Sequence, residues 1–165
     1  MSILLRHLKA VCMTKIPVAA RYLHFEKGSY SRVTDLDLKS SGDLFQWSLN
    51  LADHHGKWGF NDIVFRDKWC SDIRPKLLEF EKLTWGELAS QAKGRGSGIK
   101  HHHVQVSCLT RSAQKRLRKD LLYDDLDDIF SLRLTGKIRL YGIIIERVMN
   151  LVWFDPRHEI LPMRY

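Results

Sequence analysis

The stretch FSLRLTGKIRLYGI (residues 130–143) decides the fold of this chain, together with VMNLVWFDPRHEILP (residues 148–162). Apolar and polar side chains alternate along three runs of these residues, which is the pattern of strands with one buried face. Thr135-Gly136-Lys137 separates the first two runs, and Glu146-Arg147 separates the second from the third. Pro156 has no N–H to give to a sheet and should end the third strand. These signals predict a three-stranded antiparallel meander.

Upstream of the meander, helical spacing dominates. Apolar residues recur at helical intervals from Ile63 to Leu83, with Pro75 near a first helical turn. Thr84 followed three residues later by Glu87 is a capping-box pattern, so a short helix should begin at Trp85. Between residues 107 and 126 an apolar residue returns every four positions, while basic residues occupy the other sides. This second pattern predicts a basic amphipathic helix.

Two short strands are expected before these helices. Apolar residues alternate with polar ones from Leu44 to Leu51, which indicates a half-buried strand, and Val33, Leu36 and Leu38 indicate another. A length of 165 residues suits one domain. We therefore expect one α+β domain over residues 1–165, with an antiparallel sheet whose C-terminal meander packs against N-terminal and central helices. Its parts are a poorly patterned N-terminal extension (1–42), a strand and helices (43–128) and the C-terminal antiparallel sheet (129–165).

The charge of the chain points to a polyanionic partner. Lys and Arg number 27 against 19 Asp and Glu, which gives a net charge of +8. Such a surplus attracts nucleic acids, although a basic protein that is merely soluble is the alternative. Three cysteines without a CxxC motif suit a reducing compartment. No apolar run is long enough to span a bilayer. We expect a cytoplasmic protein that binds no membrane.

Two arginines form the central candidate site. Arg133 and Arg139 lie six residues apart across Gly136, and a three-residue hairpin loop would place them directly opposite each other on one face. Like charges in that position destabilise a strand pair by up to ~1 kcal/mol. A phosphate between the two guanidinium groups would reverse the sign of that effect. The alternatives are two solvated arginines on an exposed face, or a shifted register that separates them.

Neighbouring residues complete a set suited to RNA cleavage. Tyr141 shares the face of Arg139, and His158 follows the third strand, which returns beside the second. Cleavage needs a base for the 2′-hydroxyl, an acid for the leaving oxygen and cations for the phosphorane. We assign phosphate binding to Arg133 and Arg139, positioning to Tyr141 and proton transfer to His158, whose ordinary pKa suits that role. This mechanism uses no metal and no cofactor.

The same residues resemble a family. Their order, with steps of six residues from Arg133 to Arg139 and nineteen to His158, is similar to that of the RelE/ParE toxin superfamily, especially its YoeB and HigB branches. The resemblance covers the C-terminal sheet only. It implies a sheet folded against two N-terminal helices, cleavage of messenger RNA, commonly in the ribosomal A site, and neutralisation by an antitoxin. We expect such an antitoxin or regulator to be an acidic protein.

Further cations are expected to contact the phosphate backbone. They come from the glycine-rich stretch before residue 100, from the basic helix and from the ends of the meander. The set is Lys93, Arg95, Lys100, Arg111, Lys115, Arg116, Arg118, Lys119, Lys137 and Arg157. For the helix, a solvated face is the alternative interpretation.

The sequence predicts no metal site. Of the three consecutive histidines, only His101 and His103 would share a strand face, and a zinc site needs four ligands. The aspartates between Asp124 and Asp128 are more typical of a solvated surface than of a magnesium site. Asp53, in the segment DHHG, is interpreted as part of a polar turn.

Three functions remain open from the sequence. The leading hypothesis is a metal-independent, toxin-like endoribonuclease that cleaves messenger RNA, with the ribosome as one setting. The alternative is a non-enzymatic basic nucleic-acid-binding or inhibitor module, of phage or plasmid type, that blocks a nucleic-acid machine. A DNA-binding accessory domain is the third, although the sequence contains no clear recognition-helix signature.

Overall fold

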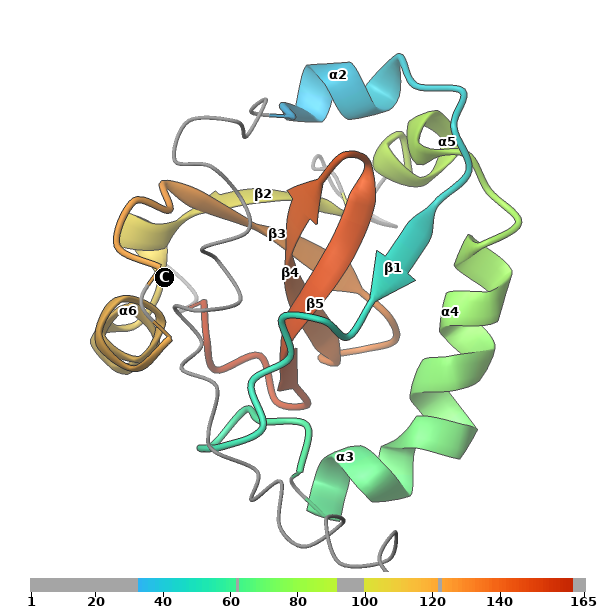
Figure 1. Cartoon of the computed structure of the whole chain (residues 1–165). Coiled ribbons are helices and arrows are strands. Elements are labelled where there is room, and N and C mark those ends of the chain that lie inside the picture. The colour runs from blue at the N-terminus through green and yellow to red at the C-terminus, as the bar shows by residue number, and fades with distance from the viewer. Residues whose placement is uncertain (1–32, 62, 92–99, 122, 162–165) are drawn as a thin grey trace, which may run out of the picture.

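A computed structural model describes residues 33–61, 63–91, 100–121 and 123–161 of the chain. It is an α+β fold built on a five-stranded sheet with the strand order β1-β5-β4-β3-β2 (Figure 1). β1 is parallel to β5, and the other neighbours are antiparallel. The last three strands form the predicted meander. The strands are β1 (Gln46–Ser48), β2 (His102–Gln105), β3 (Asp128–Arg133), β4 (Arg139–Ile145) and β5 (Val148–Asp155).

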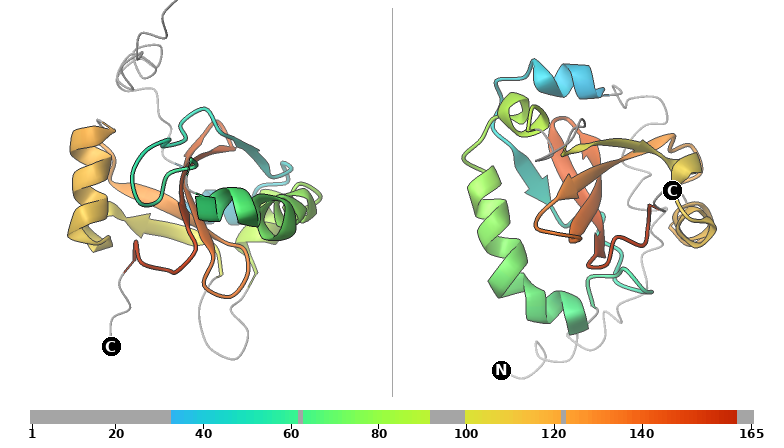
Figure 2. Two further views of the ribbon diagram at one scale, coloured as in Figure 1. Left: turned by 90° about the horizontal axis from the view of Figure 1, so that it is seen from below. Right: turned by 180° about the vertical axis from the view of Figure 1, so that it is seen from behind.

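Helices cover both faces of the sheet (Figure 2). A nearly continuous helical segment covers one face, made of α3 (Ile63–Lys68), the π-helical turn η1 (Trp69–Ile73) and α4 (Arg74–Phe80), with α5 (Trp85–Ala89) after it. The other face carries α6 (Arg111–Lys115) and its π-helical continuation η3 (Arg116–Asp120). The remaining elements are α2 (Asp35–Lys39) and the short 3-10 turn η2 (Val106–Cys108). Within the described residues, no helix is long and apolar enough to cross a membrane.

Two apolar clusters hold these layers together, one on each side of the sheet. Leu140 belongs to the first cluster, under α4 and α5, whereas the next residue, Tyr141, belongs to the second, under α6. Leu132 and Ile129 of β3 divide between the two clusters in the same way. The alternation predicted from the sequence therefore reflects a sheet that is buried on both faces.

A β-bulge interrupts this alternation in β5. Tyr141 pairs with Trp153 and Gly142 pairs with Leu151, so Val152 is the extra residue. A Cβ atom on Gly142 would lie 2.7 Å from the carbonyl oxygen of Asn150. The bulge thus brings the two backbones so close that only glycine fits.

Proline explains the π-helical turn. Pro75 has no N–H and would clash with the carbonyl four residues earlier in a regular helix. The helix widens instead, and the N–H of Arg74 donates to the carbonyl of Trp69, five residues back. The chain thereby continues into α4 without a break, as the sequence pattern from Ile63 to Leu83 predicted.

Both hairpin turns form as predicted. The N–H of Leu134 donates to the carbonyl of Ile138 at 3.1 Å, which closes a three-residue loop with Gly136 at φ +46°. Between β4 and β5, Glu146 and Arg147 both have positive φ, of 49° and 64°. Two consecutive positive φ values are typical of the tight turns that match strand twist.

The N-terminal expectations need correction. The strand expected around Val33 to Leu38 is wrong: Asp35–Lys39 form α2, which Thr34 and Asp37 cap reciprocally. The expected strand from Leu44 to Leu51 shrinks to β1, and β1 pairs in parallel with β5. Local capping thus overrode a weak alternation in the first case.

Candidate nucleic-acid interface

The arginine pair has the predicted register. Arg133 in β3 and Arg139 in β4 are direct partners across the antiparallel ladder. Leu132 and Leu140 beside them point into the first apolar cluster, so both arginines face the opposite side, that of Tyr141. Arg133 is half-buried, and Lys137 in the connecting turn is exposed.

Arg139 is held in place by the hairpin itself. Its side chain is 8% exposed, and its Nη1 donates to the carbonyl oxygens of Gly136 and Ile138, both at 3.0 Å. Burial lowers the pKa of Arg139, and Arg133 adds to this effect, whereas Tyr141 and Asp155 oppose it. The hairpin therefore fixes the guanidinium, and the charge of Asp155, its ladder partner in β5, partly compensates it without forming an ion pair.

Lys100 brings a third cation to this end of the sheet. Its Nζ donates to Gln91 Oε1 at 3.1 Å. Burial lowers the pKa of Lys100, as do the charges of Lys76 and Arg133, while Glu79 has the opposite effect. We call Lys100, Arg133, Lys137 and Arg139 the hairpin cluster. Among the described residues, none of its members makes an ion pair with a carboxylate.

His101 supports the cluster from beneath. The backbone N–H of Arg133 donates to its Nδ1 at 3.1 Å, and the ring is 1% exposed. Burial, reinforced by the charges of Lys100 and Arg139, lowers the pKa of His101 to about 3. The imidazole therefore stays neutral beside the cations. No sequence signal distinguished this histidine from its two neighbours.

Tyr141 departs from its expected catalytic role. Its side chain is 0% exposed in the second apolar cluster, and burial raises the pKa of its hydroxyl. The helical layer of α6 covers the sheet face on which it lies, so a substrate has no access to it. The sequence showed the correct face but not that this face is covered.

His158 lies in a segment that Asp155 organises. The buried carboxylate of Asp155 accepts N–H groups from Arg157, Glu159 and Ile160, at 3.2, 3.0 and 2.8 Å. His158 itself is half-buried with φ +61°, and its Nδ1 has no hydrogen-bond partner in the described part of the chain. Within those residues, no hydrogen bond or ion pair joins His158 to either arginine. Arg157 is exposed beside it.

The helix formed by α6 and η3 presents most of its cations to solvent. Ala113 and Leu117 are buried, whereas the basic side chains on the outer sides are exposed: Arg111, Lys115, Arg118 and Lys119. These four suit contacts to a phosphate backbone. Lys93 and Arg95 lie outside the described residues.

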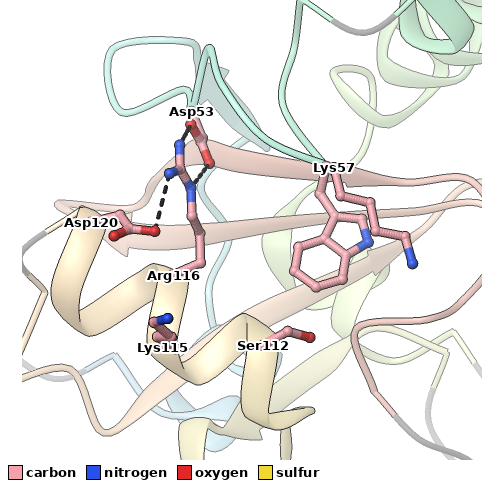
Figure 3. A pocket seen from close by; sticks show the side chains of 7 residues that line it. Asp53, Lys57, Ser112, Lys115, Arg116 and Asp120 are labelled. Atoms are coloured by element: carbon pink, nitrogen blue, oxygen red, sulfur yellow. Dashed lines mark hydrogen bonds and ion pairs between the residues drawn. The ribbon is translucent and has the colours of Figure 1, made fainter.

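Arg116 departs from the expected phosphate contact. Its Nε and Nη2 donate to the two carboxylate oxygens of Asp53, at 2.9 and 2.7 Å, and its Nη1 donates to Asp120 at 3.1 Å (Figure 3). The hydrogen bonds that Arg116 donates to Asp53 raise the pKa of Arg116, although burial opposes them. Its guanidinium is thus committed to carboxylates of the protein.

Asp53 is the buried residue that sequence reasoning missed. It is 3% exposed and also accepts the indole N–H of Trp153 at 3.0 Å and the backbone N–H of His55 at 2.9 Å. The DHHG segment does turn, but its aspartate joins the loop after β1 to η3 and β5. Since Arg116 is far away in the sequence, no local spacing could have predicted this pairing.

The described residues offer no metal centre. No group of three or more His, Cys, Asp or Glu side chains among them is arranged to hold an ion. His103 instead contacts Asp35, with Nδ1 2.7 Å from Oδ1.

Comparisons of the chain with protein-family models, with curated proteins and with solved structures found no match.

Proposed function

We propose that this chain is a nucleic-acid-binding protein that holds phosphate groups at the hairpin cluster. One observation carries the proposal: Arg133 and Arg139 stand directly opposite each other, and no carboxylate of the described residues forms an ion pair with them. Opposed like charges destabilise a strand pair by up to ~1 kcal/mol. A buried cation whose pKa is perturbed, as burial perturbs that of Arg139, is typical of binding sites.

The geometry suits a bridging phosphate. Nη1 of Arg139 is bound to the hairpin carbonyls, whereas its Nε and Nη2 make no hydrogen bond with described residues. Arg139 is only 8% exposed, so the half-buried Arg133 opposite it would meet a phosphate first, with these nitrogens of Arg139 behind it, and a guanidinium fork matches phosphate oxygens. Lys100, whose charge interacts with that of Arg133, and Lys137, exposed in the turn, add two point charges.

Binding is better supported than cleavage. The expected catalytic set loses Tyr141, which is buried, and His158 forms no hydrogen bond or ion pair with the arginines among the described residues. These facts favour the non-enzymatic alternative. RNA is the expected nucleic acid, on the strength of the resemblance to RelE/ParE toxins. An acidic regulator protein would compete for the same cations.

RNA cleavage is a second candidate, favoured by the state of His158. A non-glycine residue at φ +61° is a strained conformation of the kind that clusters at functional sites. Its Nδ1 is buried and has no hydrogen-bond partner among the described residues.

Titration of a labelled single-stranded RNA tests the proposal. We expect Arg133→Ala and Lys100→Ala each to weaken binding about tenfold or more, as for the loss of one charge-assisted hydrogen bond of at least about 1.5 kcal/mol. Arg66→Ala, which removes an exposed arginine from α3, is the matched control and should stay within about twofold. Equal affinities for Arg133→Ala and Arg66→Ala would refute the site.

A gel of the same RNA separates the two candidates. Intact RNA after incubation with the wild type removes the cleavage hypothesis. Cleavage by the wild type that disappears in His158→Ala establishes it.

A further inference from the structure

A second site lies on the α6 side of the sheet. A pocket of about 250 Å³ opens between the loop that follows β1 and the helix of α6 and η3 (Figure 3). No residue of the hairpin cluster lines it. Its volume is just below the ~300–1,000 Å³ of sites for drug-sized ligands, so it suits one planar ring system.

The back wall of the pocket is rigid. Asp53 binds Arg116 through two hydrogen bonds, and Asp120 takes the remaining nitrogen of that guanidinium. The three side chains hold one another in place, and four of the five N–H groups of Arg116 are used, two by Asp53, one by Asp120 and one by the carbonyl of His55. This wall offers fixed carboxylate oxygens, but it does not attract a phosphate.

The floor is aromatic and equally fixed. Trp58 lines the pocket while remaining only 6% exposed, and its ring packs on Trp153 with a centroid distance of 5.7 Å. Lys57 lies over the Trp58 ring, 5.6 Å from its centroid, and is paired with Glu159 at 2.7 Å. Because Lys57 and Trp153 both lie against this indole, a flat ligand would meet only its small exposed part, which does not have to reorganise.

The rim supplies polar groups of the right kind. Ser112 and Lys115 are exposed, one helical turn apart on α6, and both line the pocket. A hydroxyl can donate to or accept from a ring edge. Lys115 has no ion pair among the described residues, so its ammonium is available to an anion at the mouth.

We propose that this pocket takes one base of a nucleotide against Trp58 and Ser112, with the phosphate of that nucleotide on Lys115. The aromatic floor suits a planar ring, and Lys115 on the rim suits an anion attached to that ring. The inference rests on the proposed function, which it deepens by adding a base-sized subsite. Register places both sites on the same face of the sheet, because Tyr141, two residues after Arg139, pairs with Trp153 under Trp58.

The test follows the indole N–H signal of Trp58 in the full chain by NMR, assigned through Trp58→Phe. Adenosine 5′-monophosphate should shift this signal saturably, and inorganic phosphate at equal concentration should not. Ser112→Phe fills the pocket and should abolish the shift. Lys115→Gln should weaken binding up to about fivefold, as for one exposed ion pair, while Lys39→Gln, at an exposed position on α2 outside the pocket, should not.

Two outcomes overturn the inference. One is an equal shift with inorganic phosphate, and the other is a shift that survives Ser112→Phe while the Trp153 signal shows an intact fold. The hairpin variant Arg133→Ala separates the two sites. It should lose affinity for the RNA strand and keep its response to adenosine 5′-monophosphate, so failure of either site is recognised independently.

Discussion

His101 couples the hairpin cluster to pH. Its neutral ring accepts the N–H of Arg133 and lies among the cations of Lys100 and Arg139. Protonation of His101 would add a buried positive charge beside those of Lys100 and Arg139. It would also remove the acceptor for the N–H of Arg133. The burial of His101, which accepts the N–H of Arg133, therefore makes this part of the molecule sensitive to acid.

Acid should destabilise the protein through this histidine. The folded-state pKa of His101 is about 3, against 6.5 for an unperturbed histidine. Above pH 6.5 both states are neutral, but as the pH falls from 6.5 toward 3 only the unfolded state binds the proton. His101 should thus lower the free energy of unfolding by roughly 1.4 kcal/mol per pH unit in that window.

Urea unfolding of the wild type and His101→Asn, at pH 7, 6, 5 and 4, measures this effect. Asparagine can keep an acceptor for the N–H of Arg133 without titrating, and the other groups titrate alike in both proteins. The stability of the wild type relative to the variant should fall as the pH falls. A constant difference would show that His101 is not buried as a neutral ring.

At this scale, sequence reasoning succeeded where partners are local. A three-residue loop fixes the register of its own hairpin, so the pairing of Arg133 with Arg139 could be predicted. Asp53 and Arg116 meet only because the whole fold brings a loop to a helix. No pattern near either residue records that contact.

Among the elements, the β4–β5 pair depends on one glycine. The bulge at Val152 turns two successive side chains to the α6 side, and Gly142 lies opposite where the backbones approach. A Cβ atom there would be 2.7 Å from the Asn150 carbonyl oxygen and 2.9 Å from Met149 Cε. The carbonyl cannot move without breaking the ladder of the central strands.

Gly142→Ala should therefore destabilise the protein by about 1–3 kcal/mol, the usual cost of overpacking a core. Gly42→Ala is the matched control, because a Cβ atom at Gly42 would meet nothing within 4 Å. That control should be neutral or slightly stabilising, by less than ~1 kcal/mol. Thermal unfolding followed by circular dichroism compares the two. Equal melting temperatures would mean that the strands separate easily at the bulge.

At the scale of helices and strands, strong local sequence signals predicted the elements correctly. The pairing of strands that are distant in the sequence was not predicted. The capping box at Thr84 and Glu87 marks the start of α5 as predicted. The parallel pairing of β1 with β5 depends on residues as distant as Ser48 and Asn150, whose side chains share a hydrogen bond of 2.7 Å. Alternation shows that a strand has two faces, but it does not show which strand lies beside it.

For the whole molecule, the question is whether net charge or its placement binds nucleic acid. The surplus of +8 would attract any polyanion, wherever its cations lie. Exposed basic residues lie on α6–η3 and at Lys137 of the hairpin cluster, on one side of the molecule, and others lie on α2, α3 and α4. A single strand that follows this face could contact both regions.

The salt dependence of RNA binding distinguishes the effect of the net charge from the effect of where the cations lie. For single strands, log K falls against log salt with a slope near −0.7 for each phosphate neutralised. Lys100→Ala with Arg133→Ala should therefore reduce the magnitude of the slope for RNA by about 1.4. Lys39→Ala with Arg66→Ala removes the same charge from exposed positions on α2 and α3, and should leave the slope nearly unchanged. If both double variants lose slope equally, binding follows net charge alone. Then the opposed arginines of β3 and β4 have no part in it.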